Sequence, residues 1–227
     1  MNLQVTACPS PNFGARPTGT RIDLVVLHYT GMKSAKDALD RLCDPEAEVS
    51  AHYLIDENGK VYRLVQETDR AWHAGASYWQ GATNINDRSI GIEIVNPGHE
   101  FGYRPFPEMQ MTSVEILLAD ILARYDIPPD RVVGHSDIAP ERKQDPGELF
   151  DWKRLADKDL SVWPPEAADL PADEEIITLL QAIGYDPDAS LKAKLTAFQR
   201  RFVPDNVSGG LNPKTARAIV SIASITT

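Results

Sequence analysis

The alternation of short apolar runs with amphipathic segments is the feature that most constrains this chain. Residues 24–27 and 89–95 are apolar runs of strand length, and a third short run spans residues 131–134. Between the second and third runs, a helical pattern opens at Thr112, with Glu115 three residues later as in a capping box. Strands that alternate with helices form one sheet covered by helices, so the pattern predicts an α/β or α+β domain with a central mixed sheet.

Local signals place further elements around these strands. A helix is expected over residues 34–42 with Ser34 as its N-cap. The strand-like segments 51–55 and 61–65 flank an Asn-Gly pair, which predicts a hairpin. Residues 71–88 are irregular and rich in glycine and tryptophan, so we interpret them as a long functional loop.

The C-terminal part of the chain has a different character. After Trp163-Pro164-Pro165, residues 166–171 are small, acidic and bounded by proline, which is typical of a linker. Helical patterns follow over residues 173–183 and 191–202, and from Asn212-Pro213 to residue 222. We therefore expect a first domain over residues 1–165 and a three-helix domain over residues 172–227. A module of this size is near the lower limit for independent stability, so it is expected to lean on the first domain.

Charge and hydropathy exclude several classes of protein. Asp and Glu total 33 against 23 Lys and Arg, a formal net charge of -10. Such a surface repels phosphate backbones and gives no attraction to anionic membranes, so no nucleic-acid partner is expected. Apolar runs stay well short of the roughly 20 residues that a membrane span needs.

The N-terminus and the two cysteines indicate the cellular compartment in which the protein is expected. Residues 1–6 have neither a basic nor an apolar stretch, so they do not form a secretory signal and a cytoplasmic protein is expected. A different gene start would make the periplasm the alternative. Cys8 and Cys43 do not make a disulfide framework and are expected to be unpaired reduced thiols.

Two histidines occupy matched positions at predicted strand ends. His28 ends the first apolar run and His135 follows the third. If these strands are parallel neighbours, both imidazoles project from one edge of the sheet, where α/β proteins bind ligands. A single strand-end histidine is more often a hydrogen-bonded surface residue. Asp145, in an Asp-Pro-Gly sequence that could be only a turn, would complete a set of two imidazoles and one carboxylate, which suits one catalytic Zn²⁺.

Two further charged residues stand out near these candidates. Glu93 lies within the apolar strand 89–95. Because side chains alternate between the two faces of a strand, Glu93 shares a face with Gly91, which has no side chain and leaves room for a ligand. It is either a general base with a raised pKa or an exposed residue of an edge strand. Lys143 precedes Asp145 by two residues, so in an extended segment the two side chains share a direction. Its ammonium could stabilise an oxyanion, although a solvated lysine is the usual interpretation.

Taken together and in order, these segments resemble a known family. They are VVLHYT at 25–30, SAHYLI at 50–55, AWHAG at 71–75, SIGIE at 89–93, VGHSDIAP at 133–140 and RKQDPG at 142–147. The chain resembles the zinc-dependent N-acetylmuramoyl-L-alanine amidases of the amidase-2 type, the AmpD/AmiD group, over about residues 20–160. That group shares its fold with peptidoglycan recognition proteins. The segments LTAFQRRF at 195–202 and GGLNPKTA at 209–216 look like a three-helix peptidoglycan-binding module.

The resemblance implies roles for individual residues. His28, His135 and Asp145 match the zinc ligands, Glu93 the catalytic acid/base and Lys143 the transition-state lysine. His73 matches a residue of the substrate cleft, and Trp72 and Tyr29 are further candidates for binding substrate. His52 is taken as structural and His99 as an exposed loop residue.

The implied activity is hydrolysis of the amide between N-acetylmuramic acid, or its 1,6-anhydro form, and the L-alanine of the stem peptide. The partner is then a muropeptide or peptidoglycan, and the role is cell-wall turnover and recycling. The alternative is a protein that binds peptidoglycan fragments without cleaving them; such proteins usually lack a zinc ligand, and here all three positions are filled. Protein partners and the oligomeric state stay unknown from sequence.

Overall fold

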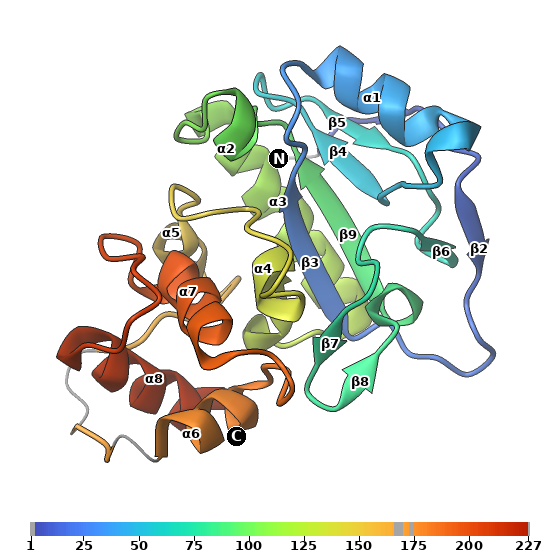
Figure 1. Cartoon of the computed structure of the whole chain (residues 1–227). Coiled ribbons are helices and arrows are strands. Elements are labelled where there is room, and N and C mark those ends of the chain that lie inside the picture. Colours follow the sequence, from blue (N-terminus) through green and yellow to red (C-terminus); the bar gives the residue numbers. More distant parts are fainter. Residues whose placement is uncertain (1–2, 166–169, 173–174, 227) are drawn as a thin grey trace.

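A six-stranded mixed sheet forms the centre of the molecule (Figure 1). The computed structural model describes residues 3–165, 170–172 and 175–226. The strands lie in the order β1 (Val5–Ala7), β5 (Val61–Arg63), β4 (Tyr53–Ile55), β9 (Ser89–Ile94), β3 (Leu24–Tyr29) and β10 (Val132–Gly134). β4, β9, β3 and β10 are parallel to one another, and β5 joins β4 as the antiparallel arm of the predicted hairpin. The predicted central mixed sheet is confirmed.

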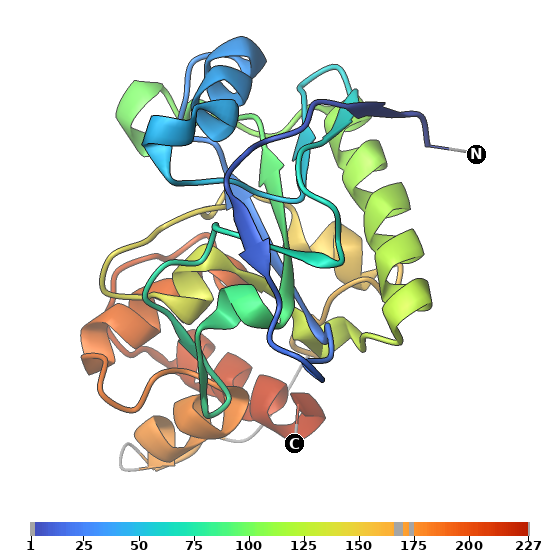
Figure 2. The ribbon, with the colours of Figure 1, turned by 90° about the vertical axis from the view of Figure 1, so that its right-hand side faces the viewer.

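Helices cover both faces of this sheet. The larger ones are α1 (Ala35–Cys43), α3 (Glu108–Tyr125), α6 (Glu175–Ile183), α7 (Leu191–Phe202) and α8 (Pro213–Thr226). The shorter ones are α2 (Gly98–Phe101), α4 (His135–Ile138) and α5 (Trp152–Ala156). Figure 2 shows α3 along one face and the C-terminal helices α6–α8 on the opposite side. Ser34 caps α1 by accepting a hydrogen bond from the Asp37 N–H, as the sequence predicts.

Strict alternation along β3 divides the core between the two faces. Val25 and Leu27 are fully buried against α3 and α5, together with the isoleucines of β9. Leu24 and Val26 point the other way and are buried in a cluster that contains side chains of α6, α7 and α8. A strand that is covered on both faces reads as a continuous apolar run, which is why residues 24–27 lack polar residues.

The long helix begins four residues earlier than the sequence predicts. α3 starts at Glu108, directly after Pro107, so Thr112 lies inside the helix and its hydroxyl donates to the Glu108 carbonyl. Glu115 does not complete a capping box, because its carboxylate accepts hydrogen bonds from Arg154 and Lys158. The predicted helix start at Thr112 is therefore wrong. Glu115 binds Arg154 and Lys158, which are distant in sequence, and does not cap the first turn of a helix.

The loop predicted over residues 71–88 contains short regular elements. β6 (Asp69–Ala71) pairs with β2 (Phe13–Ala15), and a two-stranded hairpin joins β7 (Tyr78–Trp79) to β8 (Ala82–Thr83). The 3-10 turn η2 (Ile85–Asp87) follows; two other such turns, η1 (Pro45–Ala47) and η3 (Pro129–Arg131), lie elsewhere. The expected linker at 166–171 and the first residues of the helix predicted at 173–183 fall largely outside the described residues. None of the helices described is long and apolar enough to cross a membrane.

Two cysteines that are distant in sequence lie beside each other. The Cys8 and Cys43 Sγ atoms are 3.9 Å apart, and both are free thiols. Cys8 follows β1 and Cys43 ends α1, so their proximity is a product of the tertiary fold.

A buried ion pair joins α7 to the first part of the chain. Arg201 on α7 is 3% exposed, and its Nη1 donates to Asp137 Oδ2 at 3.0 Å. Its Nη2 donates to the Val132 carbonyl at 2.7 Å, and its guanidinium lies over the Trp152 ring. Tyr185 donates to the other Asp137 oxygen at 2.7 Å. The C-terminal helices are therefore anchored to the sheet by polar as well as apolar contacts.

Replacing Arg201 with Met is expected to lower the free energy of unfolding by about 3–5 kcal/mol, because Asp137 is fully buried and would lose its charged partner. Thermal or urea unfolding measures the effect. Arg217→Met is the matched control, since Arg217 is exposed on α8. Equal stability of the two variants would contradict an anchoring role for Arg201.

Candidate metal centre and active site

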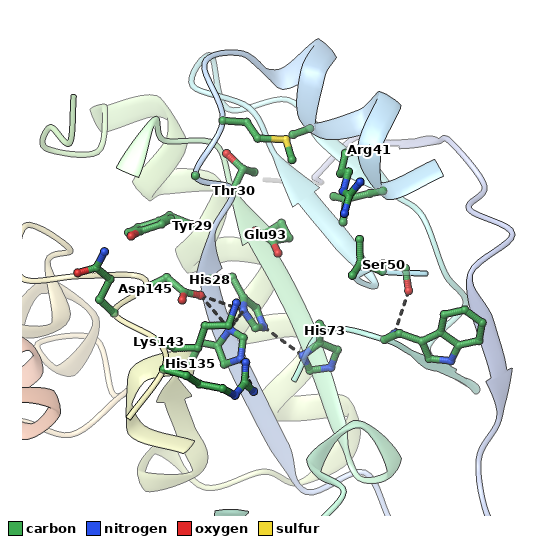
Figure 3. Close-up of a pocket in the computed structure, with 18 residues that line it drawn as sticks. His28, Tyr29, Thr30, Arg41, Ser50, His73, Glu93, His135, Lys143 and Asp145 are labelled. Atoms are coloured by element: carbon green, nitrogen blue, oxygen red, sulfur yellow. Dashed lines mark hydrogen bonds and ion pairs between the residues drawn. The ribbon is translucent and has the colours of Figure 1, made fainter. Parts of the chain in front are cut away.

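The site forms where the parallel strands end (Figure 3). His28 lies near the end of β3 and Glu93 is its register partner on the neighbouring strand β9. His135 follows β10 directly and is the first residue of α4. Because β3, β9 and β10 are parallel neighbours, their carboxyl ends meet at one edge of the sheet. The predicted convergence of His28 and His135 is therefore explained by strand register.

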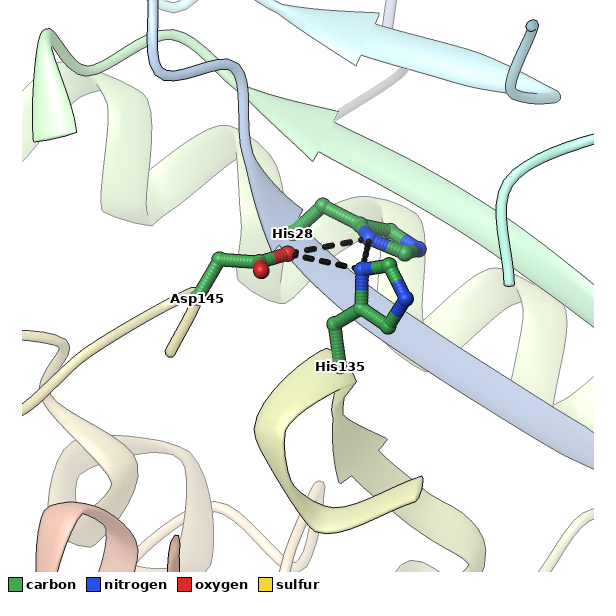
Figure 4. A group of neighbouring side chains, drawn as sticks. All are labelled: His28, His135 and Asp145. Carbon is green, nitrogen blue, oxygen red and sulfur yellow. Dashed lines mark hydrogen bonds and ion pairs between the residues drawn. The ribbon is translucent and has the colours of Figure 1, made fainter. Parts of the chain in front are cut away.

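Three donor atoms converge at this edge (Figure 4). His28 Nδ1 is 2.9 Å from His135 Nδ1, and Asp145 Oδ2 is 3.1 Å from each of them. All three residues are buried. Ligands of a tetrahedral zinc ion are separated by about 3.3–3.6 Å, so a small outward movement would admit one. The three residues could hold a metal ion.

His28 Nδ1, His135 Nδ1 and Asp145 Oδ2 form a triangle, and contacts outside it suit tautomers in which each histidine carries its proton on Nε2. His135 Nε2 lies 3.1 Å from the Ala74 carbonyl oxygen, to which it donates in the tautomer with the proton on Nε2. Ser89 donates its hydroxyl to the Ile85 carbonyl and therefore accepts from His73 Nε2. His73 Nδ1 is then the acceptor for His28 Nε2–H at 3.1 Å. In these tautomers both inward-facing Nδ1 atoms offer a lone pair, the state that metal ligation requires.

Electrostatics favour the same protonation states. Burial, with the charge of His135 next, lowers the pKa of His28 to about 4, so its imidazole is neutral at pH 7. Burial also lowers the pKa of His73, with His28 and His52 contributing. Burial acts against ionisation of Asp145, but charge and hydrogen bonds from His135 and His28 keep its pKa well below the ordinary value. An ionised Asp145 carboxylate therefore faces the neutral imidazole of His28.

Glu93 is an unpaired carboxyl group beside the triangle. Its side chain faces the pocket from β9 (Figure 3), and its Oε2 is buried without a hydrogen-bond partner. Burial raises the pKa of Glu93 well above the ordinary value, Asp145 adds to the rise and Lys143 opposes it. A buried, unsatisfied carboxyl oxygen is costly, which marks Glu93 as a candidate functional group.

These groups line one pocket of about 400 Å³. Tyr29, Trp72, His73 and Lys143 line it with the metal-binding candidates, so the structure gathers every predicted site residue. Residues that sequence reasoning did not single out also line it, among them Thr30, Arg41, Ser50, Arg142 and Gln144. Of these five, only Arg41 stood outside the quoted motifs.

Besides His73, two histidines lie outside the triangle and serve other contacts. His52 Nδ1 accepts the Gly91 N–H at 3.0 Å, and burial, with Arg16 next, lowers its pKa to about 3. His52 thus supports β9, which agrees with a structural role. His99 lies on α2, where Nδ1 is 3.0 Å from the Tyr29 hydroxyl and Nε2 is 3.2 Å from Glu148. Nothing in the sequence indicated that His99 would contact the pocket residue Tyr29.

The fold and the pocket define the chain as an α/β protein with a candidate metal centre at the carboxyl edge of its sheet. The model of the N-acetylmuramoyl-L-alanine amidase family, Amidase_2, matches residues 18–148. The chain is 39% identical to the N-acetylmuramoyl-L-alanine amidase AmiD of Escherichia coli over 223 residues, which cover 86% of this chain and 80% of that protein. It belongs to the N-acetylmuramoyl-L-alanine amidase family and is an enzyme of that family.

Other relatives and solved structures agree with this assignment. The 1,6-anhydro-N-acetylmuramyl-L-alanine amidase AmpD of Haemophilus influenzae is 39% identical over 163 residues, which cover 64% of this chain and 86% of that protein. The E. coli AmiD structure, in complex with the substrate anhydro-N-acetylmuramic acid-L-Ala-D-gamma-Glu-L-Lys, has a TM-score of 0.81 at 35% identity and covers 92% of both chains. The Pseudomonas aeruginosa AmpDh3 complex with anhydromuramic pentapeptide has a TM-score of 0.84 at 33% identity, and covers 92% of this chain and 94% of that one.

Proposed function

We propose that this chain hydrolyses the amide between N-acetylmuramic acid, or its 1,6-anhydro form, and the L-alanine of the stem peptide, in cell-wall turnover and recycling. The observation that carries the proposal is the convergence of His28, His135 and Asp145 within 3.1 Å of one another, with the unpaired Glu93 beside them. The two similar complexes whose names include anhydromuramyl peptides support this class of substrate.

His28, His135 and Asp145 would hold one Zn²⁺. Two imidazoles and one carboxylate leave the fourth position of a tetrahedral ion open, as in catalytic zinc sites. When bound, zinc supplies a Lewis acid that lowers the pKa of water and polarises the scissile carbonyl. The inward lone pairs on both Nδ1 atoms and the low pKa of Asp145 support this assignment.

Glu93 acts as the acid/base in this proposal. Its carboxylate accepts a proton from the attacking water and returns that proton to the departing alanine amine. A pKa raised by burial suits both steps, because the group must gain and then lose the same proton. Lys143 lines the same pocket, and its ammonium would stabilise the negative charge that develops on the carbonyl oxygen.

Tyr29, Trp72 and His73 are proposed to contact substrate. All three line the pocket, and the two aromatic side chains offer flat apolar surfaces to a sugar ring or a peptide. His73 also has a positioning role, since its Nδ1 accepts the His28 Nε2–H. We further propose that residues 1–165 carry the catalysis and that residues 172–227 form a peptidoglycan-binding-like unit that braces them.

The proposal is tested with purified protein and 1,6-anhydro-N-acetylmuramyl tripeptide, with and without a zinc chelator. Mass spectrometry is expected to detect free tripeptide, and chelation is expected to abolish its release until zinc is restored. No release by protein that contains zinc would favour a non-catalytic peptidoglycan-fragment binding protein.

Gly91→Ala tests whether His73 positions the His28 ring through the contact between His28 Nε2 and His73 Nδ1. A Cβ at Gly91 would lie 2.4–2.7 Å from three ring atoms of His73, so the ring must move and His28 would lose its acceptor. We expect zinc affinity to fall about 10–100-fold, the usual cost of losing an outer partner of a metal-bound histidine. Competition with a chelating dye measures this affinity. Gly210→Ala is the control, because its Cβ would lie 3.7 Å from the nearest atom; unchanged affinity in Gly91→Ala would remove His73 from this role.

A further inference from the structure

Helix α4 carries one metal-ligand candidate and holds the backbone of a second. It has only four residues, His135–Ile138, and His135 is the first of them. The N–H of Ser136, the next residue, donates to the Asp145 carbonyl oxygen at 2.9 Å. The position of α4 therefore decides where both His135 and Asp145 stand, whereas the third candidate, His28, comes from β3.

A helix of one turn does not hold its own shape. Helix nucleation is unfavourable, because several dihedral angles are fixed for the gain of one hydrogen bond. In α4 the Ala139 N–H closes the turn by donating to the His135 carbonyl oxygen at 3.0 Å. Functional side chains must be held within about 0.5 Å of their working positions. Contacts with the rest of the protein must therefore fix the α4 turn.

Asp137 makes these contacts from within α4. Its side chain is fully buried. Its Oδ2 accepts the N–H of Gly134, the residue before His135, at 2.8 Å. The same oxygen accepts from Arg201 Nη1 on α7 at 3.0 Å, and Oδ1 accepts from the hydroxyl of Tyr185, which follows α6, at 2.7 Å. Two donors from the C-terminal helices thus meet at a carboxylate two residues from His135.

Both donors are rigidly placed. Tyr185 is 1% exposed and Arg201 is 3% exposed. The Arg201 guanidinium lies 4.5 Å from the centroid of the Trp152 ring, and its Nη2 donates to the Val132 carbonyl of β10 at 2.7 Å. Burial, with Asp137 next, raises the pKa of Tyr185 well above the ordinary value, so its hydroxyl keeps the proton that it donates.

The competing interpretation is that the bond from the Gly134 N–H to Asp137 is enough to fix the turn. That bond joins residues three positions apart and moves with the turn, so it fixes the shape of the turn but not its place against the sheet. Arg201 binds Asp137 and the β10 residue Val132 at once, and it therefore fixes the turn relative to the sheet.

We propose that Tyr185 and Arg201 are positioning residues of the metal centre, and that they act through Asp137 on the α4 turn that places His135 and Asp145. The C-terminal helices then set the geometry of the metal ligands in addition to bracing the sheet. This inference rests on the proposed function, because that function supplies the metal. Loss of an outer partner of a metal ligand typically lowers metal affinity.

The test uses the full chain with the variants Tyr185→Phe, Arg201→Met and the control Gln199→Met. Gln199 is fully buried on α7, and its amide bonds to Ser208, Gly209, Gly210 and Thr215 within the C-terminal part of the chain. Its loss is expected to destabilise that part without touching Asp137. Zinc affinity is measured by competition with a chelating dye. The visible absorption of the Co²⁺-loaded protein reports the geometry of the ligands.

We expect Arg201→Met to lower zinc affinity about tenfold, the lower end of the cost of losing an outer partner. Tyr185→Phe is expected to cause a smaller fall and to shift the Co²⁺ spectrum in the same direction. Gln199→Met is expected to lower the unfolding temperature and to leave zinc affinity and the Co²⁺ spectrum unchanged. Circular dichroism identifies the variants that are folded, and Tyr185→Phe decides the question if Arg201→Met does not fold.

Two results would overturn this positioning role and leave the proposed function intact. One is unchanged zinc affinity and an unchanged Co²⁺ spectrum in folded Tyr185→Phe and Arg201→Met, which would leave these residues only as an attachment of the C-terminal helices. The other is an equal loss of affinity in Gln199→Met, because metal binding would then follow stability rather than the contacts of Asp137. If the unmodified protein bound neither metal, the proposed function itself would be rejected.

Discussion

Replacing Glu93 with Gln is expected to lower kcat about 10²–10⁴-fold, the range that general acid–base catalysis contributes. The amide keeps the shape of the side chain but cannot accept and return a proton. Glu93 is not one of the three converging donors, so zinc content is expected to stay the same. Product release measured by mass spectrometry gives kcat, and elemental analysis gives the zinc content.

Glu100→Gln is the matched control for this experiment, because Glu100 is an exposed carboxylate on α2. It is expected to leave both kcat and zinc content as they are. A rate for Glu93→Gln within a few-fold of the unmodified enzyme would remove Glu93 from the mechanism, and loss of zinc in that variant would mean that Glu93 acts on the metal centre instead.

Replacing Asp145 with Ala is expected to lower zinc affinity by more than about 100-fold, because even the loss of an outer partner costs 10–100-fold. The change leaves two imidazoles, too few for a catalytic site with three protein ligands. It also removes the carboxylate whose Oδ2 lies 3.1 Å from both Nδ1 atoms. Activity is expected to fall with zinc occupancy, and elemental analysis after dialysis measures that occupancy.

Asp188→Ala serves as the control for Asp145, since Asp188 is exposed in the turn before α7. Far-ultraviolet circular dichroism separates a failure to fold from a failure to bind zinc. Full zinc occupancy in folded Asp145→Ala would show that Asp145 is not a ligand. The third protein ligand beside the two histidines would then be another residue.

Much of the candidate site at the carboxyl edge of the sheet could be predicted from local sequence pattern. His28 and His135 follow short apolar runs, and parallel pairing of β3 with β10 brings them together. Glu93 stood out because a carboxylate within an apolar strand is costly. Asp145 was the weaker candidate, because an Asp-Pro-Gly sequence alone is more often only a turn, and the family resemblance strengthened it.

Local pattern failed where tertiary contacts compete with it. Thr112 and Glu115 have the spacing of a capping box, yet the helix begins at Glu108 and Glu115 binds Arg154 and Lys158 across the structure. Arg201 lies in an amphipathic helix and reads as a surface cation, but it is buried against Asp137. A pairing between residues 64 positions apart leaves no periodic trace in the sequence.

The sequence by itself determined the central mixed sheet, the strand ends that carry the histidines and the family, because hydrophobic periodicity and ordered motifs are local properties. Only the tertiary structure decided which histidine nitrogens face inward, since that depends on His73, Ser89 and the Ala74 carbonyl meeting in space. It alone brought Tyr185 and Arg201 to Asp137, two residues from His135. Such contacts depend on how distant segments pack, and packing is set by the whole fold rather than by neighbours in the chain.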